Sequence, residues 1–144
     1  MIRSLLKPSD ATPIEAADIL IISSAPSGSS PLLETLKKCG FRARCVSGLV
    51  DVLKAAKLFA PQAVILDTEH PGVDMGPDHV IRMLRLTHPN LSIIALYGAP
   101  SRRARTVAAE FGISLLFAPL AERDLTTTLQ RCGIHSATEA TCTA

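Results

Sequence analysis

The sequence has 144 residues, a length that suits one domain with one hydrophobic core. Hydrophobic residues make up 47% of the chain and charged residues 19%, and no apolar stretch approaches the roughly 20 residues of a membrane helix, so a membrane partner is not expected. A formal net charge of +2, with four Phe, one Tyr and no Trp, offers little for binding nucleic acid.

The predicted domain lies between two polar ends. Residues 1–16 contain Pro, Ser and Thr with weak periodicity and are expected to form an N-terminal arm. This arm lacks the uninterrupted apolar stretch of a secretory signal, so we expect a cytoplasmic protein. Residues 17–133 form the predicted domain, and residues 134–144 are small and polar, which is typical of a flexible tail.

The elements of this domain follow from apolar runs and from the Pro and Gly residues at their ends. An Ile-rich run predicts a buried strand at 18–23, and Pro31 and Gly40 bound the helix that follows it. Residues 41–47 alternate apolar and polar side chains, the pattern of a strand nearer the edge of a sheet. The other predicted elements are, in chain order, a helix at 48–60, a strand at 63–67, a helix at 77–88, a strand at 91–97, a helix at 100–112, a strand at 113–119 and a helix at 120–133.

Five strands that alternate with five helices predict a doubly wound α/β fold, in which a five-stranded parallel sheet is covered by helices on both faces. The third strand ends in Asp67. Because ligands of such folds bind outside the carboxyl ends of the strands, Asp67 is the first candidate for a functional side chain.

Residues 64–76, VILDTEHPGVDMG, resemble the phosphoacceptor region of the receiver domains of bacterial response regulators. Receivers typically show the pattern D-x-x-M-P-x-M-D-G, and this chain has Asp67, Pro71 and Asp74 at the matching offsets, with Glu69 in the same acidic turn. The resemblance extends over residues 18–133. It implies the (βα)5, flavodoxin-like receiver fold, a role in two-component signal transduction, and Asp67 as the counterpart of the aspartate that accepts a phosphoryl group.

The chain departs from the receiver pattern at the positions that support this chemistry. Receivers typically end the first strand in two acids, which help to hold Mg²⁺, whereas this chain has Ser23 and Ser24. A small Thr or Ser typically ends the fourth strand, where this chain has Tyr97, and a Lys precedes the Pro after the fifth strand, where it has Ala118. Because Mg²⁺ prefers several carboxylate and other oxygen ligands, we expect neither Mg²⁺ binding nor another cofactor.

These departures predict a pseudo-receiver, which is not an enzyme and acts through phosphorylation-independent contacts with another protein. Phosphoryl transfer depends on positioning and on cations that stabilise the phosphoryl oxygens. The resemblance implies that the two usual cations, the metal ion and the lysine, are missing here. Tyr97 is expected to be buried over Asp67 with its hydroxyl near the acid, so that the domain keeps one conformation. The alternative is a conventional receiver in which Asp67 is phosphorylated.

The resemblance also implies the kind of partner. Receivers bind a histidine kinase, a phosphotransfer protein or an output domain, and some form homodimers. Their fourth helix, fifth strand and fifth helix often form the docking surface, which makes Arg102, Arg103, Arg105 and Leu120 the candidate partner surface here. The other interpretation of Leu120 is packing in the core.

Three further patterns are weaker. The Ser- and Gly-containing loop Ser23–Ser30 could bind phosphate or a flavin at the start of a helix, as in flavodoxin-like proteins, but it has one Gly and no Walker Lys. His70 and His79 flank the acidic turn without a standard metal-ligand spacing, so we expect no metal site. The four Cys residues have no paired spacing and predict neither a zinc site nor a disulfide framework.

Overall fold

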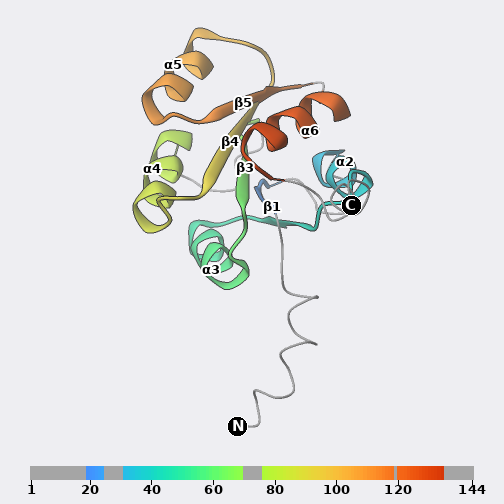
Figure 1. The fold of residues 1–144 in the computed structure, drawn as a ribbon. Helices are drawn as coiled ribbons and strands as arrows, with labels where there is room; N and C mark the ends of the chain where they lie inside the picture. The colour runs from blue at the N-terminus through green and yellow to red at the C-terminus, as the bar shows by residue number, and fades with distance from the viewer. Residues whose placement is uncertain (1–18, 25–30, 70–75, 119, 135–144) are drawn as a thin grey trace, which may run out of the picture.

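The computed structural model describes residues 19–24, 31–69, 76–118 and 120–134, and in these residues strands and helices alternate (Figure 1). The strands are β1 (Ile19–Ile22), β2 (Ala43–Val46), β3 (Ala63–Asp67), β4 (Ser92–Tyr97) and β5 (Ser114–Phe117). The helices are α2 (Pro31–Lys38), α3 (Leu49–Phe59), α4 (Pro77–Thr87), α5 (Arg102–Phe111) and α6 (Glu122–Arg131). The predicted arm at 1–16 and all but Ile134 of the predicted tail lie outside the described residues.

All five strands are parallel and lie in the order β2-β1-β3-β4-β5, which confirms the predicted fold class. The central strands β1 and β3 are buried along their whole length. Strand β2 is half-buried or exposed, because it forms an edge of the sheet, as its alternating sequence predicted. None of the described helices is long and apolar enough to cross a bilayer.

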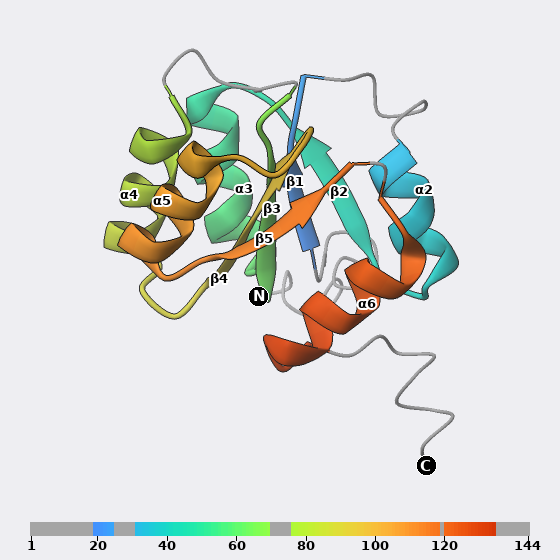
Figure 2. The same cartoon turned by 90° about the horizontal axis from the view of Figure 1, so that it is seen from above.

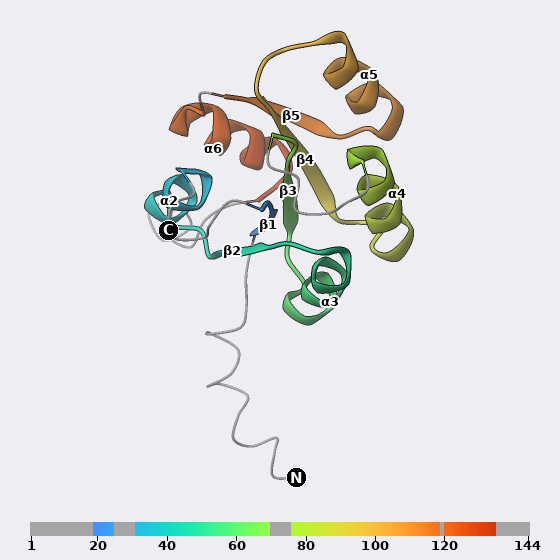
Figure 3. The same cartoon turned by 180° about the vertical axis from the view of Figure 1, so that it is seen from behind.

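Helices cover both faces of the sheet, as the view from above shows (Figure 2). Helices α3, α4 and α5 lie on one face, and α2 and α6 lie on the other; the view from behind shows the same two layers (Figure 3). Along β1, Leu20 and Ile22 pack in the cluster under α3, α4 and α5, whereas Ile19 and Ile21 pack under α2 and α6. This alternation follows from the two-residue period of a strand.

The ends of α5 show where the sequence located a boundary and where it did not. The predicted start at Pro100 is wrong, because the Ser101 hydroxyl accepts a hydrogen bond from the Ala104 amide at 3.1 Å and thus caps a helix that begins at Arg102. Gly112 ends the helix in the left-handed conformation, with φ 65°, as predicted.

Helices α4 and α5 are joined at their carboxyl ends by arginines. The Arg85 guanidinium donates to the carbonyl oxygens of Phe111 at 2.9 Å and Gly112 at 3.2 Å. The Arg82 guanidinium lies 5.6 Å from the centre of the Phe111 ring. Both arginines therefore stabilise the packing of the two helices.

Candidate functional site

Asp67 lies at the carboxyl end of β3 and is only 9% exposed. The Ser23 hydroxyl, just after β1, donates to Asp67 Oδ2 at 3.0 Å. The backbone amide of Glu69 donates to Asp67 Oδ1 at 3.1 Å, an arrangement typical of aspartates that open a turn. Both carboxylate oxygens of Asp67 are therefore held by donors from the chain itself.

The two residues after Asp67 are hydrogen-bonded to the end of β4. The amide and the hydroxyl of Thr68 both donate to the Leu96 carbonyl, at 2.9 and 2.7 Å. The amide of Gly98 donates to Glu69 Oε2 at 3.0 Å. We call this group of residues the acid edge: Ser23, Asp67, Thr68, Glu69 and Gly98.

Tyr97 is buried, as expected, but it does not cover Asp67. Asp67 is in register with Leu96, so both point to the α2 and α6 face. The next residue, Tyr97, points to the opposite face and packs among core residues of α3, α4 and α5. Among the described residues its hydroxyl has no hydrogen-bond partner, so the predicted contact with the acid is wrong.

The Tyr97 hydroxyl lies near the amino-terminal turns of two helices. Burial raises the pKa of Tyr97 above its ordinary value of 10.0, the nearby Asp78 of α4 raises it further, and Arg103 of α5 opposes both. Asp78 Oδ1 is itself buried and finds no hydrogen-bond partner in the part of the chain that the structure describes. The ring is thus held by apolar packing and not by hydrogen bonds of its hydroxyl.

The charge of Asp67 affects the pKa of Cys45 on β2. Burial raises the pKa of the Cys45 thiol, the Asp67 carboxylate raises it further, and Lys37 of α2 opposes them. Cys45 and Cys132 are free thiols. Raised pKa values disfavour the thiolate, so Cys45 is a poor nucleophile here.

The other predicted site positions are placed as follows. Ala118 is exposed, and its amide donates to the Tyr97 carbonyl at 2.9 Å, so it lies at the same carboxyl edge of the sheet. Ser24 is exposed and Ser23 is buried. Pro71 and Asp74 lie outside the described residues.

The candidate partner surface is divided between the two faces. Arg102, Arg103 and Arg105 are exposed on the first turns of α5, as expected of a docking surface. Leu120 is half-buried against the cluster under α2 and α6, on the other face of the sheet. This position agrees with the packing interpretation of Leu120, and its part in a partner surface stays a prediction.

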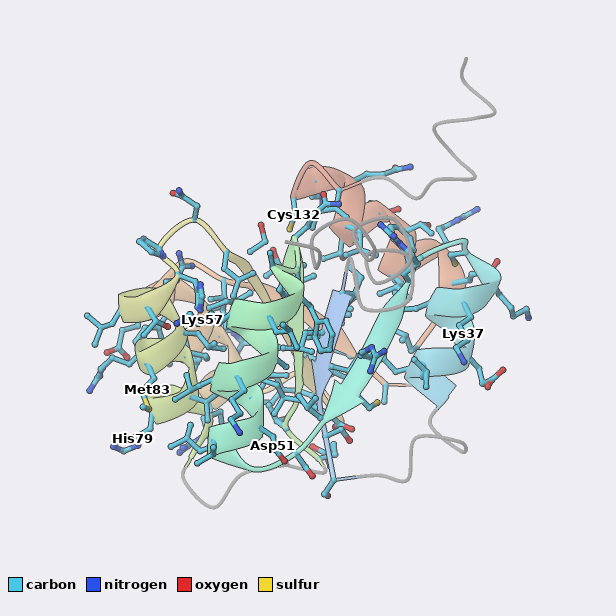
Figure 4. The ribbon with its side chains drawn as sticks, turned by 90° about the horizontal axis from the view of Figure 1, so that it is seen from below. Lys37, Asp51, Lys57, His79, Met83 and Cys132 are labelled. Carbon is cyan, nitrogen blue, oxygen red and sulfur yellow. The ribbon has the colours of Figure 1, made fainter. Side chains whose placement is uncertain are left out.

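The weaker patterns find less support. His79 is exposed and points away from the sheet (Figure 4), while His70 lies outside the described residues. Among the described residues, no group of three or more His, Cys, Asp or Glu side chains is placed to hold a metal ion. Of the loop Ser23–Ser30, only Ser23 and Ser24 are described, and the Ser23 hydroxyl is bound to a carboxylate. An acid at this position would repel phosphate.

Sequence reasoning missed the roles of Thr68, Gly98 and the Glu69 side chain. Each of them depends on which residues β3 and β4 bring side by side, and nothing in the local sequence specifies that register. The dipeptide Tyr97–Gly98 before Ala99 and Pro100 signals a turn, but it does not identify the residue that contacts the turn.

The fold is similar to those of known receiver domains. The chemotaxis protein CheY4 of Vibrio cholerae is 20% identical with a TM-score of 0.68, over 81% of this chain and 98% of that one. The receiver domain of NtrX from Brucella abortus is 20% identical with a TM-score of 0.70, over 80% and 97%. The receiver domain of a signal transduction histidine kinase from Syntrophus aciditrophicus is 21% identical with a TM-score of 0.65, over 81% and 89%. No protein-family model matches the chain, and no curated protein matches it.

Proposed function

We propose that this chain, which has the fold of response-regulator receiver domains, is a signalling module that binds another protein without being phosphorylated on Asp67. The observation that carries the proposal is the state of Asp67, which is 9% exposed with Oδ2 and Oδ1 accepting from Ser23 and from the Glu69 amide. An attacking carboxylate must reach a phosphodonor. A buried carboxylate that is satisfied by the chain is poorly placed to do so.

The charge around Asp67 supports the same conclusion. Ser23 and the Glu69 amide are neutral donors, and Ala118 offers no charge at the end of β5. A phosphoryl group on Asp67 would add about two negative charges beside the Glu69 carboxylate. That charge would require a fixed cation, and the positions at which receivers typically carry two acids and a lysine are Ser23, Ser24 and Ala118 here. We therefore infer that the domain needs no Mg²⁺ and catalyses no reaction.

The partner is proposed to dock on the arginines of α5. The first turn of this helix has Arg102 and Arg103 and no acidic residue. Cations at the amino-terminal end of a helix oppose its macrodipole, so these arginines cost stability in the free domain. Their exposure makes them available to an acidic surface of a signalling protein such as a histidine kinase, a phosphotransfer protein or an output domain.

Partner affinity tests the proposal. The partner recovered on the immobilised chain would be titrated with the wild type, with Asp67→Asn and with Arg102→Glu. We expect Asp67→Asn to leave the affinity unchanged and Arg102→Glu to weaken it with a marked dependence on ionic strength. Loss of affinity in Asp67→Asn alone would instead favour the second candidate function, a phospho-accepting receiver whose switch depends on Asp67.

A further inference from the structure

The Glu69 carboxylate fills the space beside the backbone of Gly98. A Cβ atom built on Gly98 would lie 2.9 Å from Glu69 Cδ, closer than real Cβ atoms approach, and 3.0 Å from each carboxylate oxygen, which is tighter than most real contacts. The φ angle of Gly98 is outside the left-handed range, so its backbone does not require glycine. What the structure requires at position 98 is therefore space for the carboxylate.

The same carboxylate uses the hydrogen-bond donor of Gly98. The Gly98 amide donates to Glu69 Oε2 at 3.0 Å, and β4 ends one residue earlier, at Tyr97. The amide is thus a donor at the carboxyl edge of the sheet that is occupied by an oxyanion. The backbone amide of Glu69 also donates to Asp67 Oδ1. Glu69 therefore contacts both the acid, through its amide, and the Gly98 amide, through its side chain.

We propose that Glu69 and Gly98 form a matched pair, in which the end of β4 is an oxyanion-binding position and its resident ligand is the chain's own carboxylate. Because Glu69 is tethered two residues from Asp67, its effective concentration at the Gly98 amide is high, and a free anion competes poorly. The pair also joins the segment after β3 to the segment after β4. This inference deepens the proposed function, on which it rests for its signalling meaning, because it explains how the acid edge keeps one arrangement without a phosphoryl group.

A double-mutant cycle tests the matched pair. Gly98→Ala in the wild type places a methyl group against the carboxylate, which is the end of a flexible side chain and will move away, losing its hydrogen bond without unfolding the domain. In a Glu69→Ala background the same methyl group meets no carboxylate. There, Gly98→Ala is expected to stabilise the domain, because alanine restricts the unfolded chain and suits a φ angle outside the left-handed range.

The readouts are the denaturant midpoint and hydrogen exchange of the residue-98 amide. We expect exchange to rise about threefold to tenfold in Glu69→Ala, equally in Gly98→Ala, and no further in the double variant. Gly98→Ala should raise the midpoint more in the Glu69→Ala background than in the wild type. Glu69→Gln, which keeps the length and a carbonyl acceptor but lacks the charge, should give intermediate protection.

Two results would overturn the pair. Additive effects of Glu69→Ala and Gly98→Ala on amide exchange would mean that the two residues act separately, and full protection in Glu69→Gln would mean that the position does not select an oxyanion. These outcomes are separate from the proposed function. A phosphoryl adduct on wild-type Asp67 would contradict the proposed function but would not change the result of the mutant cycle. Failure of the cycle would contradict the Glu69–Gly98 pair but not the proposal that Asp67 is not phosphorylated.

Discussion

Asp67 and Tyr97 end adjacent strands of the sheet, and their side chains point to opposite faces of it. The register of β3 and β4 pairs Asp67 with Leu96, so Tyr97 alternates to the face covered by α3, α4 and α5. The acid and the aromatic ring therefore contribute to stability through separate contacts. Substitutions at the two positions are expected to have independent effects.

Removing the Tyr97 hydroxyl should cost nothing, whereas removing the ring should be costly. The hydroxyl is buried with no hydrogen-bond partner in the described ranges, so Tyr97→Phe should be neutral or stabilising by up to about 1 kcal/mol. Tyr97→Ala removes a ring that is 8% exposed and should destabilise the domain by about 3 kcal/mol. Urea unfolding of both variants measures this. A loss of stability in Tyr97→Phe would reveal a hydrogen bond that this account lacks.

Alkaline titration should show the raised pKa of Tyr97 directly, because the chain has one Tyr and no Trp. The pKa of the folded state lies above the unfolded value of 10.0, chiefly through burial. The folded state thus holds the phenol proton more tightly than the unfolded state does. The stability is therefore at its full value below pH 10.0 and falls as the pH rises from there through the folded pKa. Phenolate absorbance should show a midpoint above 10.0, and the alkaline loss of stability should be smaller in Tyr97→Phe. Arg103→Gln should raise the midpoint further, and an unchanged midpoint would contradict the assigned environment.

The Ser23 hydroxyl should stabilise the fold through Asp67. Ser23→Ala leaves Asp67 Oδ2 without this donor in a site that is 9% exposed, so we expect a loss of about 1 to 3 kcal/mol. Ser24→Ala is the matched control, because Ser24 is exposed, and it should change stability by less than about 0.5 kcal/mol. Equal effects of the two substitutions in chemical denaturation would contradict the described role of Ser23.

The free domain should be less stable with arginines in the first turn of α5 than with acidic residues there. Arg102→Glu places a negative charge in the first turn of α5 and should stabilise the domain by about 0.5 kcal/mol at low ionic strength. The control is Arg131→Glu, which makes the same exchange in the last turn of α6 and should destabilise it. Both effects should shrink in salt. Destabilisation by Arg102→Glu would mean that Arg102 has a stabilising contact in the free domain.

The fold could be predicted from the sequence because local signals mark its elements. Gly112 and Pro77 stop and start helices through their own backbone preferences, and the apolar runs of β1 and β3 follow from burial on both faces. The start of α5 was misplaced because Pro100 was chosen over Ser101, although serine is the stronger capping signal. Boundaries of this kind depend on one side-chain hydrogen bond.

The site was less predictable because it depends on register. The sequence identifies Asp67 and Ser23 as site positions. It does not predict the hydrogen bond between them, because the two residues are 44 positions apart and meet only when β1 and β3 pair. The direction of Tyr97 was wrong because its alternation with Ile93 and Ala95, which share its cluster, was not followed along the strand. The half-burial of Leu120 agrees with its packing interpretation, and a part in a partner surface stays a prediction because no partner is present to define that surface.

The central claim, that Asp67 does not accept a phosphoryl group, is tested most directly by intact mass spectrometry. The wild-type chain and Asp67→Asn would be incubated with a small acyl phosphate and Mg²⁺, and their masses compared before and after. The account predicts unmodified masses for both proteins, because Asp67 is buried and held by Ser23 and by the Glu69 amide. A stoichiometric phosphoryl adduct on the wild type that is missing from Asp67→Asn would contradict it.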